Sequence, residues 1–140
     1  HINTVMETCG HCDGDALEEA CRHLDTLIFD IKHLSTDIHR EGTGTGNERI
    51  LANFLRVCSA FPALPIIART PVIPGFNDTE ADIRAIARFL PKRANLVHEL
   101  LPYHRMGQTK YAFLGRAFPM GGAQLATGTL RRLQDVSMAR

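Results

Sequence analysis

The sequence lacks several features that would assign it to a specialised class of protein. No apolar run approaches the roughly 18 to 20 residues of a membrane span, and no signal peptide is visible. The formal net charge is only +1, so no basic field favours nucleic acid or an anionic membrane as a partner. Four cysteines in a chain able to bury a sizeable core are typical of reduced thiols, and we expect a cytoplasmic protein.

What is present is ordinary globular composition in 140 residues, with 44% hydrophobic and 22% charged residues. That length is enough for one domain with a real core. The chain opens on His1 rather than Met, and residues 2–6 already have the composition of a strand. We therefore expect a piece of a longer protein.

Two kinds of hydrophobic periodicity alternate along the chain. Apolar and β-branched runs predict strands at about 2–7, 27–32, 65–72 and 96–101. Apolar residues at helical spacing predict helices at about 15–24, from Asn47 to just before Phe61, from Asp78 to about Pro91, and at about 127–138. Between them, 33–46 and 105–122 are expected to be loops with one helical turn each. Strand and helix alternate four times, which predicts a single α/β domain over 1–140, built as a parallel sheet from right-handed βαβ units.

The strand at 27–32 is unusual because it carries two opposite charges at its end. Side chains alternate across a strand, so Leu27, Phe29 and Ile31 share one face, while Asp30 and Lys32 share the other. A charge in a low-dielectric site is costly unless it is paired or bound to a ligand. Asp30 and Lys32 therefore form an ion pair within a core or belong to a binding site.

The other predicted strands favour the binding site. The first ends in Glu7, the third carries Arg69 and the fourth runs into His104. Ligands of α/β sheets and barrels bind at the carboxyl edge of the strands, where these side chains would converge with Asp30 and Lys32. Carboxylates beside Lys, Arg and His suit a zwitterionic ligand with a carboxylate, an amine and a ring, together with a bound cation.

The most conspicuous short motif is Cys9-Gly10-His11-Cys12, which follows a strand and opens a helix, as a redox pair does. The surrounding carboxylates disfavour the thiolate that redox chemistry needs. A zinc site would add Cys21 and His23, which lie two apart on a helix and point to different sides. A Cys-x3-Cys-x2-Cys iron–sulfur triad is excluded, because its first cysteine would stand four residues before Cys9, where the chain has Val5. Ordinary loop and core cysteines are the simplest interpretation, and a thiol-disulfide protein or a non-catalytic binding module is the alternative.

Six co-linear motifs together are far more specific than any of these. They are Glu7-Thr8-Cys9-Gly10, Phe29-Asp30-Ile31-Lys32-His33, Thr43-Gly44-Thr45-Gly46-Asn47-Glu48, Arg69 to Asp78, Glu99 to His104, and Gly107-Gln108-Thr109-Lys110-Tyr111 with Leu114-Gly115. In this order and spacing the chain closely resembles the second half of the glycyl-radical-enzyme activating enzymes, radical S-adenosylmethionine proteins of the pyruvate formate-lyase activase type. The resemblance implies a partial, TIM-like (β/α)6 barrel, of which this chain would supply the third to sixth strands.

The resemblance also implies cofactors and partners. In the family, a 4Fe-4S cluster binds the methionine amine and carboxylate of S-adenosylmethionine. One electron, from reduced flavodoxin or ferredoxin, releases a 5′-deoxyadenosyl radical. That radical takes a Cα hydrogen from one glycine of a large glycyl radical enzyme, and the protein's task is positioning and exclusion of water.

Carried over residue by residue, Glu7 and Asp30 match carboxylates near the methionine end of the cofactor. Thr8 would help them to hold a monovalent cation. Lys32 and Arg69 match residues around the cofactor carboxylate, the ribose and the substrate glycine loop. Each has a structural alternative: Asp30 and Lys32 would form an ion pair, and Arg69 would clamp strand ends.

His104 matches a residue beside the adenine, and Leu101 lines the same pocket. The alternative for His104 is a loop histidine with no role in binding. Glu99 is expected to be a structural partner for a buried cation rather than a base. The resemblance assigns no catalytic side chain to this chain.

The departure from the family is large, because neither the cluster triad nor a Gly-Gly-Glu cofactor motif is present. The sequence therefore predicts a fragment that holds no cluster and is inert alone. Its first strand would be an unpaired sheet edge, and such edges tend to pair with another chain. We expect the fragment to self-associate through residues 2–7.

Overall fold

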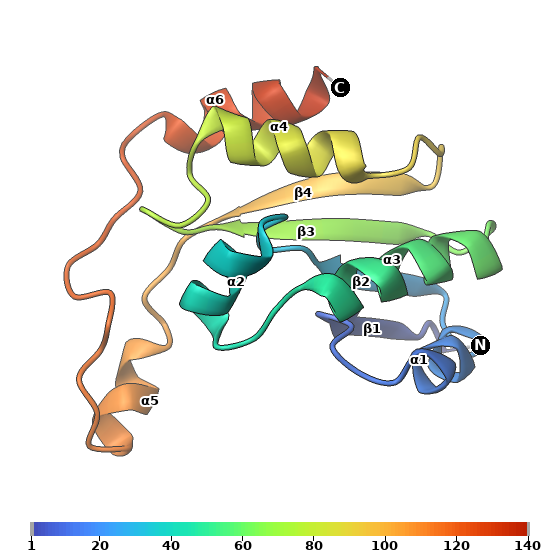
Figure 1. The fold of residues 1–140 in the computed structure, drawn as a ribbon, viewed down its shortest axis with the longest axis horizontal. Helices are drawn as coiled ribbons and strands as arrows, with labels where there is room; N and C mark the ends of the chain where they lie inside the picture. The colour runs from blue at the N-terminus through green and yellow to red at the C-terminus, as the bar shows by residue number, and fades with distance from the viewer. Residues whose placement is uncertain (1, 140) are drawn as a thin grey trace.

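The structure, a computed structural model, describes residues 2–139 and contains a four-stranded parallel sheet in the order β1-β2-β3-β4 (Figure 1). The strands are β1 Val5–Thr8, β2 Thr26–Asp30, β3 Ile66–Val72 and β4 Leu96–Pro102. The helices are α1 Gly14–Cys21, α2 Thr36–Thr43, α3 Glu48–Ala60, α4 Glu80–Phe89, α5 Gln108–Phe113 and α6 Thr129–Met138. The predicted α/β fold with four parallel strands and flanking helices is confirmed.

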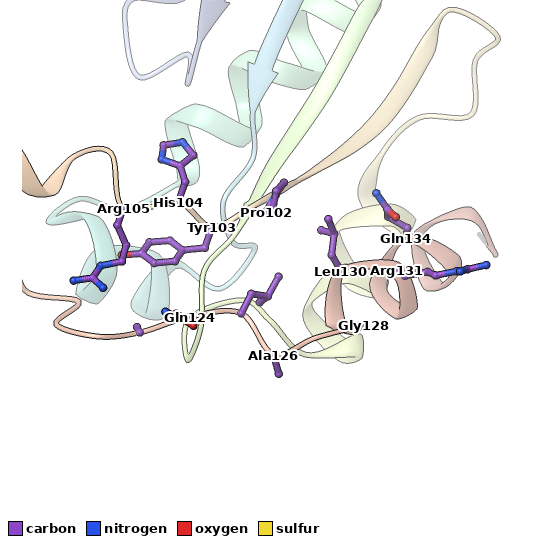
Figure 2. Close-up of a pocket in the computed structure, with 12 residues that line it drawn as sticks. Pro102, Tyr103, His104, Arg105, Gln124, Ala126, Gly128, Leu130, Arg131 and Gln134 are labelled. Atoms are coloured by element: carbon purple, nitrogen blue, oxygen red, sulfur yellow. The ribbon is translucent and has the colours of Figure 1, made fainter.

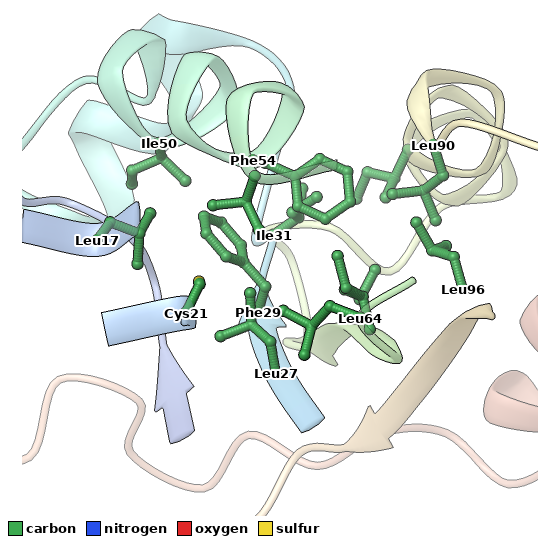
Figure 3. Packing of buried hydrophobic residues seen from close by; sticks show 14 residues of the cluster. Leu17, Cys21, Leu27, Phe29, Ile31, Ile50, Phe54, Leu64, Leu90 and Leu96 are labelled. Carbon is green, nitrogen blue, oxygen red and sulfur yellow. The ribbon is translucent and has the colours of Figure 1, made fainter. Parts of the chain in front are cut away.

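One face of the sheet packs against the helices and forms the core. On β2, Leu27 and Phe29 are fully buried, as predicted from the alternation, and Ile31 just beyond the strand is buried too. Figure 3 shows Phe54 of α3 near Phe29 of this strand. The two rings meet edge to face, with their centroids 5.2 Å apart. A smaller cluster, comprising Val72, Ile83, Leu100 and Leu133, joins β3 and β4 to α4 and α6.

The opposite face of the sheet is open at its edges. Val5 on β1 and Val97 on β4 are 54% and 58% exposed. The same face carries Ile28, Ile67 and the charged side chains described below. β1 is one of the two edge strands of the described sheet, and self-association through it stays a prediction. Among residues 2–139, no helix is long and apolar enough to cross a membrane.

Two helix starts differ from the sequence-based expectation. Asn47 does occupy the position before α3, but its side chain makes no capping bond there; its amide donates to the His33 carbonyl instead, at 2.7 Å. Asp78 does not cap α4: Thr79 does, accepting a hydrogen bond from the Asp82 amide. Asp78 accepts from the Gly75 amide within the preceding turn. Local sequence cannot distinguish adjacent Asp and Thr as caps, since both side chains suit the position.

The turn after β1 depends on a glycine. Gly10 has φ +66°, and a Cβ placed on it would lie 2.2 Å from Cζ of the buried Phe29 ring. Asn53 of α3 holds the same turn by donating hydrogen bonds to the carbonyls of Gly10 and Cys12, at 2.8 and 3.0 Å. The backbone of the Cys9–Cys12 segment is thus fixed by packing and by one buried amide.

Candidate functional site

The carboxyl ends of the strands converge on one cavity. The parallel register places Asp30, Arg69 and Glu99 side by side on β2, β3 and β4. A cavity of about 310 Å³ is lined by Glu7, Asp30, Arg69, Pro71, Ile73, Leu101, Pro102, Tyr103 and His104. Five of the six predicted cofactor-binding residues therefore meet around one space, and Lys32 is the exception.

Arg69 pairs with carboxylates from two other strands beside this cavity. Its Nε donates to Glu99 Oε2 at 2.7 Å, and its Nη1 lies 2.9 Å from Glu7 Oε2. The side chain is only 16% exposed, and the hydrogen bond to Glu99, followed by that to Glu7, raises the pKa of the guanidinium above its ordinary value. Arg69 thus links β1, β3 and β4, and Glu99 is the structural partner for a cation that the sequence predicted.

Asp30 and Lys32 form the ion pair that the sequence offered as an alternative. Lys32 Nζ donates to Asp30 Oδ2 at 2.7 Å. This pair leaves the other carboxylate oxygen, Oδ1, buried without a hydrogen-bond partner among the described residues. An ionised carboxylate accepts hydrogen bonds at both oxygens, and a buried acceptor left unpaired is costly. Asp30 is therefore an ion-pair partner that still has an acceptor to offer to a cationic group.

Lys32 lies past the end of β2, two residues beyond the last strand residue. Its carbonyl accepts a hydrogen bond from the fully buried amide of Asn77, at 2.7 Å. The same amide donates to the Pro71 carbonyl, and its oxygen accepts from the Ile73 amide. Asn77 thereby joins the ends of β2 and β3 where the β-ladder has stopped.

The side chain of Lys32 borders a second space beside the cavity. This groove of about 480 Å³ shares Ile73 and Tyr103 with the cavity, and we call it the aromatic groove. Its other walls come from α2, from the turn after β3 and from the segment around α5. Its residues are Lys32, Ile38, Glu41, Gly42, Thr43, Ile73, Pro74, Gly75, Phe76, Tyr103, Tyr111, Pro119 and Met120.

Tyr103 is the residue that sequence reasoning missed. It lines both the cavity and the aromatic groove, and its hydroxyl is buried without a hydrogen-bond partner among the described residues. It also borders a third space, about 520 Å³, between the end of β4 and α6. Figure 2 shows its ring pointing away from Leu130 and Gln134 of α6, with the exposed imidazole of His104 beside it. Its place immediately before His104, directly after a strand, was the available signal.

The predicted monovalent cation site, Glu7 with Thr8 and Asp30, stays a prediction. The hydroxyl oxygen of Thr8 accepts a hydrogen bond from the Gly10 amide at 3.0 Å, and Glu7 is paired with Arg69. Within residues 2–139, no three His, Cys, Asp or Glu side chains are grouped as metal ligands.

The four cysteines are free thiols and do not form a site together. Cys9 is exposed on the turn after β1. Cys21 is buried in the core, and burial, with a smaller contribution from Glu18, raises the pKa of its thiol. Burial also raises the pKa of Cys58 on α3. These positions agree with the simplest interpretation, loop and core cysteines.

The chain is similar to several curated proteins of one kind. The chain is 51% identical over 133 residues to the (2S)-3-sulfopropanediol sulfolyase activating enzyme of Bilophila wadsworthia (strain 3_1_6), covering 95% of this chain and 44% of that protein. It is 49% identical over 137 residues to the isethionate sulfite-lyase activating enzyme of Desulfovibrio desulfuricans (strain ATCC 27774 / DSM 6949 / MB), covering 98% and 44%. Its homologues are activating enzymes of glycyl radical enzymes.

More distant activating enzymes match over the same length. The 4-hydroxyphenylacetate decarboxylase activating enzyme of Clostridioides difficile (strain 630) is 31% identical, over 97% of this chain and 43% of that protein. The chain spans less than half the length of the activating enzymes it matches. The resemblance recognised in the sequence is confirmed. A scan of protein families finds no match to the chain.

Solved structures agree on the fold. A domain of the pyruvate-formate lyase-activating enzyme from Bacteroides vulgatus ATCC 8482 has a TM-score of 0.77 at 23% identity, covering 99% of this chain and 76% of that one. A radical SAM methyltransferase from Sphaerobacter thermophilus has a TM-score of 0.68 at 15% identity, covering 96% and 37%. At these identities the likeness concerns the fold alone.

Proposed function

We propose that this chain is part of a cytoplasmic enzyme that activates a glycyl radical enzyme, and that its strand ends hold S-adenosylmethionine for that reaction. The observation that carries the proposal is the meeting of Glu7, Asp30, Arg69, Leu101 and His104 around one cavity. Homology to activating enzymes supports the reaction class. Reduced flavodoxin or ferredoxin would be the electron donor.

The residues of the cavity suit that cofactor. The unpaired buried Oδ1 of Asp30 is an acceptor for an ammonium group, or for a monovalent cation held with Glu7 and Thr8. The guanidinium of Arg69 carries five N–H groups, more than its contacts with Glu7 and Glu99 use, and a carboxylate would bind there.

The adenosine end would lie against His104 and Leu101, where an exposed imidazole and an aliphatic side chain offer stacking and apolar contact. When bound, S-adenosylmethionine would supply the radical that removes a hydrogen from a glycine of the partner enzyme. The chain's own residues bind and orient the cofactor, and Asn77 keeps the two loop ends beside it in place. The 4Fe-4S cluster would need ligands other than those of residues 2–139.

The proposal is tested in the intact activase that carries this segment, with Asp30→Asn as the variant. Asp37→Asn is the matched control, because Asp37 is an exposed carboxylate on α2 (95% exposed side chain) whose ion-pair partner is Arg40 of the same helix. Removing a charge that accepts from a cationic group costs roughly 1.5–3 kcal/mol, so D30N should weaken S-adenosylmethionine binding about tenfold or more in calorimetry. The glycyl radical signal in electron paramagnetic resonance should fall with it.

D37N should match the wild-type protein in both measurements. Equal cofactor affinity in D30N and wild type would refute the role of Asp30. A wild-type protein that binds no S-adenosylmethionine and yields no glycyl radical would refute the function itself.

A further inference from the structure

A chain of polar side chains crosses the sheet on its helix-covered face. It begins on α6, which lies next to α4 on the β4 side of the sheet (Figure 1). Ser137 Oγ of α6 is 2.7 Å from Nδ1 of His98 on β4, and Nε2 of that ring is 3.0 Å from the hydroxyl of Thr70 on β3. The hydroxyl donates to the Ile31 carbonyl at 2.8 Å. The chain therefore connects α6 to the residue that follows Asp30.

The hydrogen bonds at Thr70 have a defined direction. A hydroxyl has a single hydrogen, and Thr70 gives it to the Ile31 carbonyl, so its oxygen can only accept from His98. Nε2 of His98 therefore carries a proton. A neutral ring with its proton on Nδ1 would instead offer Nε2 as an acceptor, which would compete with Ile31 for the hydrogen of Thr70. The imidazole thus decides where the Thr70 hydroxyl points.

The hydroxyls of this chain lie in an apolar layer. Thr70 is fully buried and Ser137 is 5% exposed. In the sheet register Thr70 stands beside Leu100, a member of the smaller apolar cluster. An apolar side chain would fill such a position without needing partners, whereas a buried hydroxyl is costly unless it is hydrogen-bonded. The position of Thr70 therefore points to a role for the hydrogen bonds themselves.

Ile31 is where this chain meets the site. β2 ends at Asp30, so the course of the next residues depends on other bonds. The Ile31 amide donates to the Arg69 carbonyl at 2.9 Å, while its carbonyl accepts from Thr70, so both of its peptide units are tied to β3. Residues two apart on an extended chain point to the same side, which lets Lys32 reach Asp30 at 2.7 Å.

We propose that His98 and Thr70 are positioning residues for the cofactor cavity. The imidazole keeps the Thr70 hydroxyl on the Ile31 carbonyl, and this bond fixes the backbone that presents Asp30. The inference rests on the proposed function, which assigns Asp30 to S-adenosylmethionine. Neither His98 nor Thr70 lines the cavity, so both act through Ile31. Without the bond, the peptide between Ile31 and Lys32 could turn, and the Asp30 carboxylate would lose its fixed place.

The test measures S-adenosylmethionine affinity by calorimetry in the intact activase that carries this segment. Thr70→Val removes the hydroxyl at nearly constant volume and should weaken binding by about three- to tenfold. Thr70→Ser keeps the hydroxyl and should bind like the wild type. His98→Leu should weaken binding to a similar extent as T70V. His98→Gln should restore it, because an amide nitrogen can donate to Thr70 in place of Nε2.

Leu133→Val is the control that separates positioning from stability. Leu133 is fully buried on the same helix as Ser137, and its apolar side chain takes no part in the hydrogen-bonded chain. T70V and L133V should both lower the melting temperature. Only T70V should lower the cofactor affinity. If affinity falls in step with the melting temperature across T70V, H98L and L133V, the role of the chain is structural only and the proposal is wrong.

Combining Thr70→Val with Asp30→Asn tests whether the effect passes through Asp30. T70V should cause little further loss of affinity in the D30N protein, because the carboxylate that it misplaces is already gone. Additive losses, or equal affinity of T70V and wild type, would overturn the inference and leave the proposed function standing. A wild-type protein that binds no S-adenosylmethionine would refute the proposed function and the inference with it.

Discussion

Gly10→Ala is the substitution that tests the packing of the site most directly. Gly10 lies in the turn after β1, three residues beyond Glu7, and has φ +66°. Its position against the ring of Phe29 leaves no room for a side chain, since a Cβ would stand 2.2 Å from Cζ and 2.6 Å from Cε2. Phe29 cannot retreat easily, because it is fully buried and packs on Phe54.

Two costs add at this position. Holding an L residue in the left-handed region costs roughly 1–2 kcal/mol. Forcing a methyl group into a packed core costs about 1–3 kcal/mol more, because neighbouring side chains must leave their rotamers. G10A should therefore lower the free energy of unfolding by about 2–5 kcal/mol.

Gly44→Ala separates the two costs. Gly44 follows α2 with φ +84°, and a Cβ there would meet no atom within 4 Å. G44A should thus show only the backbone penalty, about 1–2 kcal/mol. Phe29→Leu should relieve the clash, so that G10A in the F29L background costs no more than G44A.

Chemical denaturation of the four proteins and the double variant gives these differences. If G10A costs no more than G44A, or if its cost is the same with and without F29L, then the close approach between the turn and the ring is not real. In that event, the glycine of Cys9-Gly10-His11-Cys12 would need an explanation other than packing.

Two further predictions concern the amino end of the sheet and the thiols. Arg93→Met should lower the free energy of unfolding by about 3–5 kcal/mol, because Arg93 donates to the backbone carbonyls of Cys58, Phe61, Pro62 and Leu64. Denaturant titration measures this change, and a loss below about 1 kcal/mol would contradict the prediction. Arg93→Lys should have an intermediate effect. Iodoacetamide at pH 8 should label exposed Cys9 well before Cys21 in the folded protein, because a raised pKa leaves less thiolate at any pH below it. Mass spectrometry measures the order, which should vanish in denaturant, and equal labelling rates in the folded protein would refute it.

The sequence predicted the fold well because each element has a strong periodic signal. The alternation on β2 identified the buried face correctly, since Leu27 and Phe29 point into a hydrophobic layer and Asp30 does not. Helix starts were predicted less well. Asn47 serves a distant carbonyl rather than its own helix, and such a tertiary hydrogen bond leaves no local pattern.

The site was predicted from the ends of the strands. The positions of the residues just beyond those ends were harder to predict. Convergence of charged groups follows from parallel topology alone, so Arg69 and Asp30 could be placed together. The strand was predicted to continue to Lys32, but β2 ends at Asp30. Lys32 lines the groove and donates to Asp30 of the cavity, and its part in cofactor binding stays a prediction. Tyr103 was missed although it follows a strand and directly precedes His104, because its position among three spaces depends on segments far apart in sequence.

The two faces of the sheet differ in how they are covered, and this affects the charged groups of the cavity. Parallel sheets are usually covered on both faces. Here the helices cover one face, while Val5 and Val97 at the borders of the other are more than half exposed. The ion pairs of Arg69 lie on that open face, where solvent weakens them, since Glu7 is 59% exposed. Covering the face would strengthen each contact to a charged ligand by lowering the local dielectric. Any covering of this face should therefore raise the affinity of these strand ends for a zwitterion, because the same side chains would act in a drier site.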